Sequence, residues 1–135
     1  MNPIWNDDLK VGVDMMDTDH RAFLDLLAAF ADTDDAGFVT LLGRLLQHLT
    51  EHFQRENALM LEHDFFAYPY HAAEHEAVLE DVRSRYQAAL AGDLTKARTY
   101  IDEVIGTWFL HHRNTMDWVT AQFILGDTSY GCSMM

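Results

Sequence analysis

The sequence predicts an all-α protein, an antiparallel up-down-up-down four-helix bundle with an N-terminal arm. Apolar residues recur at spacings of three and four in four successive segments, which is the period of an amphipathic helix. The connections between these segments are short, so consecutive helices are expected to run antiparallel. No alternating apolar and polar run of useful length competes as a β-strand.

The first two helices are expected over residues 18–31 and 36–63. Asp17 or Thr18 can cap the first helix, because their side-chain oxygens can accept hydrogen bonds from the free amides of a first turn. The acidic run over residues 32–35 ends it. The second segment is long, with about seven turns at 3.6 residues per turn.

Two further helices are expected over residues 69–91 and 94–125. Pro69 suits the first turn of a helix, where its missing amide hydrogen has no partner to lose. Gly92 suits the position just after a helix end, since glycine adopts the left-handed backbone there. Gly126 ends the fourth segment.

The remaining residues are expected to form an arm, residues 1–17, that lies over the bundle, and a loose tail, residues 126–135. With 135 residues, the whole chain (1–135) is expected to be a single domain. Apolar residues make up 49% of it, which is enough for a packed core and too much for a disordered acidic chain.

Charge and cysteine content exclude several classes of protein. The 9 basic and 22 acidic residues give a net charge of −13, which argues against a nucleic-acid partner. Cys132 is the single cysteine, so an intrachain disulfide and a cysteine-rich zinc site are excluded. Residues 1–10 lack the apolar run of a signal peptide, and no stretch is apolar enough to span a bilayer. We therefore expect a cytoplasmic location and no membrane span.

Each of the four apolar stripes carries polar residues that a plain helical core would not contain. Histidine lies on every stripe, and carboxylates accompany two of them. The seven residues are His20, His52, Glu56, His71, His75, His112 and Asp117. Burying an unpaired carboxylate is costly, and the stripes carry no Lys or Arg that would neutralise it. A core with these five histidines and two acids therefore predicts bound metal.

Two of the polar pairs have the spacing of metal ligands on one helix. Residues four apart differ by about 40° around an α-helix, so they point the same way one turn apart. His52 with Glu56, and His71 with His75, therefore form two ligand pairs. Either pair alone has an ordinary explanation, as a side-chain pair on a helix or a chance repeat. It is their combination that predicts a metal site.

The other candidates are placed less directly by their spacing. His112 and Asp117 are five apart, about 140° around an α-helix, so they cannot point the same way. A carboxylate at the edge of the stripe can still reach a centre that His112 meets directly. His20 is the only histidine on its stripe, where a lone histidine is more often a satisfied core residue.

Seven ligands are too many for one tetrahedral ion, and they fit two ions that share bridging carboxylates. Nitrogen and oxygen ligands without thiolate suit iron, manganese, zinc or copper, and ligand softness does not choose among these metals. A histidine-rich set leaves a metal pair with less negative charge than a glutamate-rich bundle does, which favours small neutral or anionic ligands.

These residues resemble the hemerythrin family, in its stand-alone bacterial form, over nearly the whole chain. Trp5, Val11–Gly12 and Tyr68–Pro69 also match its pattern. The ligand motifs are Asp17-Thr-Asp-His20, His52-Phe-Gln-Arg-Glu56, His71-Ala-Ala-Glu-His75 and Trp108-Phe-Leu-His-His112, followed by Asp117. Of the adjacent His111 and His112, only the second has the family spacing, and it also lies on the apolar stripe.

The resemblance implies two non-haem iron ions bridged by carboxylates and a solvent-derived oxygen. His71, His75 and His112 would hold one iron, His20 and His52 the other, and Glu56 and Asp117 would bridge them. In the family, O2 binds reversibly at the open position of the second iron and is held as a hydroperoxide. The resemblance thus implies a protein for O2 carriage, storage or delivery.

The resemblance also implies an apolar O2 pocket. Its expected lining is Phe53, Met60, Trp108 and Phe109. Two residues depart from the family pattern, which usually has Leu in place of Phe109 and Ile in place of Arg113. Phe109 would narrow the entry to the pocket. Arg113 would add a charge to it if the side chain points inward, and would change little if it points outward.

Three histidines remain outside the motifs. His48 precedes His52 by one helical turn and is a candidate hydrogen-bonding partner in the site. His63 fits a surface position, and the role of His111 stays open.

The expected partner is therefore O2, or another small diatomic or anionic ligand, and the protein is not expected to be an enzyme. No additional acid or base group and no substrate pocket is evident in the sequence. The alternatives are a di-iron enzyme or sensor that reacts with O2, peroxide or nitric oxide, and a plain bundle with zinc or no metal. A sensor normally needs an output domain, for which 135 residues leave no room.

Overall fold

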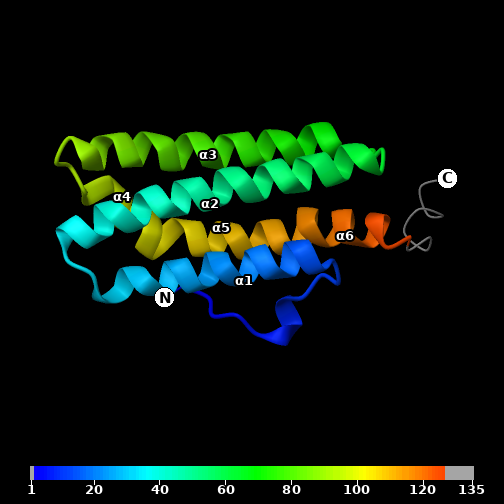
Figure 1. Ribbon diagram of the computed structural model, residues 1–135, viewed down its shortest axis with the longest axis horizontal. Helices are drawn as coiled ribbons and strands as arrows, with labels where there is room; N and C mark the ends of the chain where they lie inside the picture. Colours follow the sequence, from blue (N-terminus) through cyan, green and yellow to red (C-terminus); the bar gives the residue numbers. More distant parts are fainter. Residues whose placement is uncertain (1, 127–135) are drawn as a thin grey trace.

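The computed structural model describes residues 2–126, and within this range it contains helices and turns but no β-strand. Four helical rods lie side by side and run alternately in opposite directions (Figure 1). The first three rods are α1 (Asp14–Ala29), α2 (Asp35–Glu62) and α3 (Tyr68–Leu90). The prediction of an all-α four-helix bundle is confirmed.

The fourth rod is continuous but changes its helical type along its length. It consists of α4 (Thr95–Thr99), η3 (Tyr100–Val104), α5 (Ile105–His112), η4 (Arg113–Asp117) and α6 (Trp118–Ile124). The segments η3 and η4 are π-helical, with hydrogen bonds that span one residue more than in an α-helix. Single π turns of this kind are often found at functional sites.

The first helix begins four residues earlier than the sequence predicts, and its expected cap was wrong. Val13 is the N-cap and makes no side-chain capping bond. Asp17 instead lies inside the helix, where its carboxylate accepts hydrogen bonds from the amides of Val11 (2.8 Å) and Gly12 (3.2 Å). This carboxylate therefore ties the arm to α1. A 3-10 turn, η2 (Phe30–Asp32), follows the helix.

The other helix ends follow local sequence signals. Asp34 caps α2 by accepting a hydrogen bond from the Gly37 amide at 2.8 Å. Pro69 lies in the first turn of α3. At the other end of α3, Gly92 has a φ of +100°, and the amide of Asp93 donates to Ala88 O at 3.0 Å. This is the Schellman arrangement, which requires a left-handed residue after the helix.

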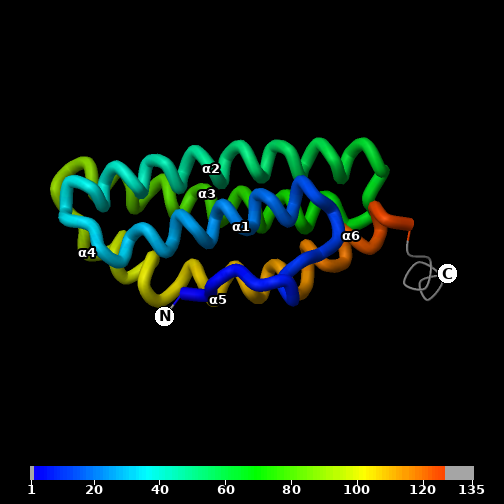
Figure 2. Tube along the Cα trace, turned by 60° about the horizontal axis from the view of Figure 1, so that its bottom comes forward, coloured from blue at the N-terminus to red at the C-terminus, as the bar shows by residue number. Residues whose placement is uncertain are grey.

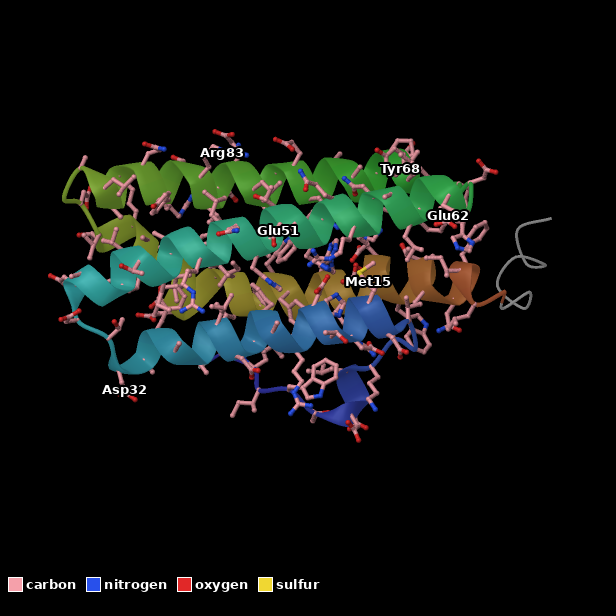
Figure 3. The ribbon with its side chains drawn as sticks, viewed as in Figure 1. Met15, Asp32, Glu51, Glu62, Tyr68 and Arg83 are labelled. Atoms are coloured by element: carbon pink, nitrogen blue, oxygen red, sulfur yellow. The ribbon has the colours of Figure 1, made fainter. Side chains whose placement is uncertain are left out.

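The interior of the bundle is apolar over most of its length. Its fully buried side chains include Phe38, Leu42, Leu45, Val82, Ile101 and Ile105. Figure 3 shows nitrogen and oxygen atoms gathered between the rods near Met15, whereas Asp32 and Arg83 lie at the outer surface. The apolar core therefore surrounds a polar group, and it fixes the backbones that carry that group.

The N-terminal arm lies across α1 and the fourth rod (Figure 2). It contains a short 3-10 turn, η1 (Asp7–Leu9). Asn2 donates a hydrogen bond to Ile101 O at 3.0 Å, and the Arg113 guanidinium donates to Leu9 O at 2.9 Å. The expected tail with Cys132 lies outside the described residues, except for Gly126. No helix between residues 2 and 126 is both long and apolar enough to cross a membrane.

The packing yields a first prediction, for Leu42→Ala in α2. Leu42 has no exposed surface, so the truncation leaves a cavity in the core. We expect the free energy of unfolding of the metal-free protein to fall by about 2–5 kcal/mol, measured by urea denaturation. Leu61→Ala in the same helix is the control, because Leu61 is 56% exposed and its loss should change little. Equal effects of the two substitutions would contradict the packing described.

Candidate metal centre

The seven predicted ligands come from all four rods and meet inside the bundle. Each is buried, and none exposes more than 5% of its surface. Their ligand atoms form two groups, within each of which all atoms lie within 4.8 Å of one another. One group is Glu56, His71, His75, His112 and Asp117, and the other is His20, His52 and Glu56.

Glu56 lies between histidines of two helices. One carboxylate oxygen, Oε2, is 2.9 Å from Nε2 of His52, one turn earlier in α2. The other, Oε1, is 2.7 Å from Nε2 of His71 and 3.3 Å from Nε2 of His75, both in α3. The spacing of four therefore works in both helices as the sequence predicts.

Asp117 has the same role on the fourth rod. Its Oδ1 is 3.0 Å from Nε2 of His112 and 3.1 Å from Nε2 of His71, and its Oδ2 is 3.0 Å from Nε2 of His20. One oxygen of each carboxylate thus contacts two of the three histidines of α3 and α5. The other oxygen contacts a single histidine, on α2 for Glu56 and on α1 for Asp117.

The π-helical segment η4 explains how His112 and Asp117 can point the same way. They are five residues apart, and an α-helix would separate their directions by about 140°. In η4 the repeat is longer, so a spacing of five returns to the same face. The expectation that these two residues cannot point the same way was therefore wrong, because it assumed a regular α-helix.

Four of the histidines use their outer ring nitrogen, Nδ1, for a hydrogen bond away from the centre. The pairs are His52 with Asp19 (2.8 Å), His71 with Thr120 (2.8 Å), His75 with Asn57 (2.9 Å) and His112 with Glu74 (2.7 Å). Thr120 donates its own proton to Met116 O, so it accepts from His71. Since Nδ1 donates the proton in such pairs, Nε2 faces the centre, and its lone pair can bind metal once any proton on it has left.

Lone pairs of imidazole and carboxylate therefore converge on one region, where a cation would be a suitable partner for them. Several buried atoms here make no hydrogen bond of acceptable geometry within the described structure, although a ring nitrogen or a carboxylate oxygen lies close to most of them. They are both nitrogens of His20, both oxygens of Glu56, Nε2 of His75 and Oδ1 of Asp117. Buried polar groups are nearly always satisfied, so this cluster of unsatisfied polar atoms fits bound metal.

Without metal, protons partly neutralise the two carboxylates. Burial lowers the pKa of His52, but Glu56 and the hydrogen bond to Asp19 outweigh it and raise that pKa to about 9. Burial also lowers the pKa of His112, but the attraction of Asp117 and Glu74 outweighs it and raises that pKa to about 10. His75 differs, because burial dominates there and lowers its pKa to about 4. Protons on His52 and His112 thus supply positive charge that a bound metal ion would otherwise supply.

The residues that bond to Nδ1 were missed by the sequence reasoning. Asp19 precedes a predicted ligand directly, as does Glu74, and Asn57 follows one directly. Asp19 is further held by the Arg55 guanidinium, with Nε at 3.0 Å and Nη2 at 2.9 Å from its Oδ2. Partners of this kind orient a ligand histidine and set its basicity. Most of them could have been predicted from the sequence, because each is a polar residue directly next to a predicted ligand.

Aromatic rings cover the histidines. Phe53 stacks on His75 with ring centroids 4.0 Å apart, and Trp108 stacks on His112 at 4.7 Å. Phe109 meets the ring of His20 edge-on at 5.2 Å.

A small cavity of about 10 Å³ adjoins this aromatic wall on the side of His20 and His52. Its lining is His20, Phe23, Leu49, His52, Phe53, Trp108, Phe109, His112 and Asp117. Three of the four expected pocket residues thus line it. The fourth, Met60, is fully buried but is not part of the lining.

The remaining sequence candidates have definite places. His48 stacks parallel to His52 and hydrogen-bonds the backbone oxygen of Asp19 through Nε2 at 3.0 Å. His63 and His111 are exposed. Arg113 points outward to the arm and adds no charge to the cavity.

Comparison with known proteins agrees with this geometry. The family model described as the hemerythrin HHE cation binding domain matches residues 11–120. The chain belongs to the hemerythrin family. Membership fits the converging nitrogen and oxygen ligands, and it makes non-haem iron the cofactor and oxygen binding the activity that the fold supports.

Two hemerythrin relatives cover most of the chain. A bacteriohemerythrin of Ralstonia nicotianae is 36% identical over 113 residues, which are 84% of this chain and 82% of the relative. A bacteriohemerythrin of Aquifex aeolicus is 34% identical over 123 residues, which are 87% and 93% of the two chains.

The ring of outer hydrogen bonds yields a prediction for Asp19→Asn. The substitution removes the negative charge that holds both His52 and Arg55. We expect affinity for ferrous iron to fall by about 10- to 100-fold, measured by competition with a chelator without air. Asp25→Asn on the exposed side of α1 removes the same charge and should leave affinity unchanged. Unchanged affinity in both variants would contradict a supporting role for Asp19.

A second prediction concerns pH. Because the raised pKa values of His52 and His112 lie above 7, both rings are protonated in the metal-free protein at pH 7. Metal binding must displace these protons, so at least two are released per molecule and affinity rises with pH toward about 10. Calorimetry in two buffers of different ionisation enthalpy measures the release. Metal uptake without proton release at pH 7 would refute this account.

Proposed function

We propose that the chain binds O2 reversibly at two non-haem iron ions and serves O2 carriage, storage or delivery. The observation that carries the proposal is the division of the buried ligands into three histidines and two histidines, joined by two carboxylates. We further propose a single-domain binding protein of the cytoplasm, with O2 or another small diatomic or anionic ligand as its partner, and not an enzyme.

The proposed ligand set follows the two histidine groups. His71, His75 and His112 would hold one iron, His20 and His52 the other, and Glu56 and Asp117 would bridge them. The second position has one protein ligand fewer, so it is where an external ligand is expected. When bound, the iron pair supplies the coordination site and the electrons that O2 binding requires.

The surroundings of the two-histidine position support binding in preference to catalysis. The small cavity adjoins His20 and His52, and Phe23, Leu49 and Phe109 supply apolar wall. Every titratable residue in its described lining is itself a proposed ligand. Such a wall excludes water and protons, and it offers a bound molecule no separate acid or base.

The size of the cavity favours the smallest ligands. A volume of about 10 Å³ holds roughly one water molecule. The Phe109 ring closes this space, packed at 5.2 Å from His20 and 5.1 Å from Phe23. We therefore propose that Phe109 sets the size limit for external ligands.

The proposed function predicts reversible spectral change. Protein loaded with ferrous iron without air should develop a visible absorption band when O2 is admitted and lose it on deoxygenation. The double variant Glu56→Ala, His75→Ala should not take up the iron pair, because it loses a bridge and a terminal ligand. Glu51→Ala with His63→Ala removes the same residue types from exposed positions and serves as the control.

Two results of that experiment would count against the proposal. One-way oxidation of the iron would contradict reversible carriage and favour an enzyme or a sensor. Normal iron uptake by the Glu56→Ala, His75→Ala variant would contradict the ligand assignment.

A further prediction follows for Phe109→Leu. The smaller side chain enlarges the cavity, so azide should bind the oxidised iron-loaded protein several-fold faster, measured by stopped-flow absorption. Phe123→Leu makes the same truncation at a ring that packs on Phe65, away from the cavity lining, and should not change the rate. The idea that Phe109 limits ligand size fails if both variants bind azide at the original rate.

A further inference from the structure

A second and much larger cavity lies where α2 turns into α3. Its volume is about 420 Å³, within the range of small-molecule sites. It is lined by Phe65, Phe66, Ala67, Tyr70, His71, Thr115, Met116 and Val119. These residues come from the connection after α2, the start of α3, and the η4 and α6 part of the fourth rod. The cavity shares none of them with the small cavity beside His20.

The wall of this cavity presents almost no polar chemistry. No carboxylate, lysine or arginine among residues 2–126 lines it. The ring nitrogens of His71 are directed elsewhere, Nδ1 to Thr120 and Nε2 to Glu56. The Thr115 hydroxyl donates to His111 O at 2.7 Å. Because a charged or strongly polar ligand would lose its hydration without replacement, the wall selects a neutral apolar one.

The cavity has a buried floor and an aromatic mouth. His71 and Phe65 are 1% and 5% exposed, whereas Tyr70 at the rim is 75% exposed. Phe65 is held in place by Phe66 and Phe123, with ring centroids 5.0 Å and 5.1 Å away. Aromatic rings favour planar ring partners, and Met116 adapts to irregular shapes. A cavity that ends on a buried ring admits a small molecule more readily than a flat protein face.

We propose that this cavity binds a neutral aromatic molecule of one or two rings, in contact with the ring of His71. The other edge of that ring carries Nε2, which lies 2.7 Å from Glu56 and 3.1 Å from Asp117. A bound molecule is therefore separated from the ligand cluster by a single imidazole. The site needs no metal to form, so the proposal is independent of the proposed O2 function.

The test uses 2-naphthol and the metal-free full chain, observed by two-dimensional NMR. We expect saturable binding with a Kd of about 0.1–1 mM, as suits a molecule of this size, with shifts in the Met116 methyl and His71 ring signals. Thr115→Trp fills the cavity from an exposed position and should weaken binding by at least about tenfold. Leu61→Trp adds the same indole outside the lining and should leave binding unchanged.

A second variant guards against a folding defect in the first. Tyr70→Ala removes a ring from the exposed rim and should also weaken binding, while the far-ultraviolet circular dichroism stays the same. Absence of saturable binding to the full chain would overturn the proposal, as would equal binding by the Thr115→Trp and Leu61→Trp variants. A concentration-dependent dimer that Thr115→Trp dissociates, without naphthol binding, would assign the cavity to a second copy and also overturn it.

Discussion

The negative charge of two carboxylates buried in the interior of the bundle is the constraint on which the rest of the structure depends. Glu56 and Asp117 are 0% and 1% exposed, and no lysine or arginine between residues 2 and 126 pairs with either. Such charges are tolerated only if cations or protons face them. All four rods must therefore supply imidazoles at the same height. The antiparallel arrangement makes this possible, because each rod passes the level of the two carboxylates once.

The apolar core and the hydrogen bonds to the Nδ1 atoms position different parts of the site. Packing among large buried side chains fixes the rods, and each imidazole is then turned by a partner on its Nδ1 atom. Several of these partners lie on a different rod from the histidine they hold. Thr120 on α6 bonds His71 on α3, and Glu74 on α3 bonds His112 on α5. The polar centre thus contributes to the alignment of the rods that create it.

Sequence periodicity was sufficient for the fold and for the two ligand pairs of α2 and α3, whereas Asp117 depends on the π-helical segment before it. The spacing of four in α2 and α3 translates directly into shared direction, because those helices are regular there. The sequence could not place the start of α1, where Asp17 bonds the arm behind it and not the turn ahead of it. The role of Thr120 could not be predicted from the sequence either, because its hydrogen bond with His71, 49 residues away, depends on how two rods pack. The outward direction of Arg113 likewise depends on where the arm docks.

The π-helical segments have a consequence for how the fourth rod is compared between proteins. Adding one residue to a regular α-helix shifts the phase of everything downstream by about 100°. In this rod the phase is reset twice, over residues 100–104 and 113–117, and the inward-facing positions are recovered after each reset. The rod behaves as three blocks of independent phase. An alignment or a designed sequence that assumes one constant period across it would misplace part of the interior after residue 113, where Asp117, Thr120 and Ala121 are the buried positions.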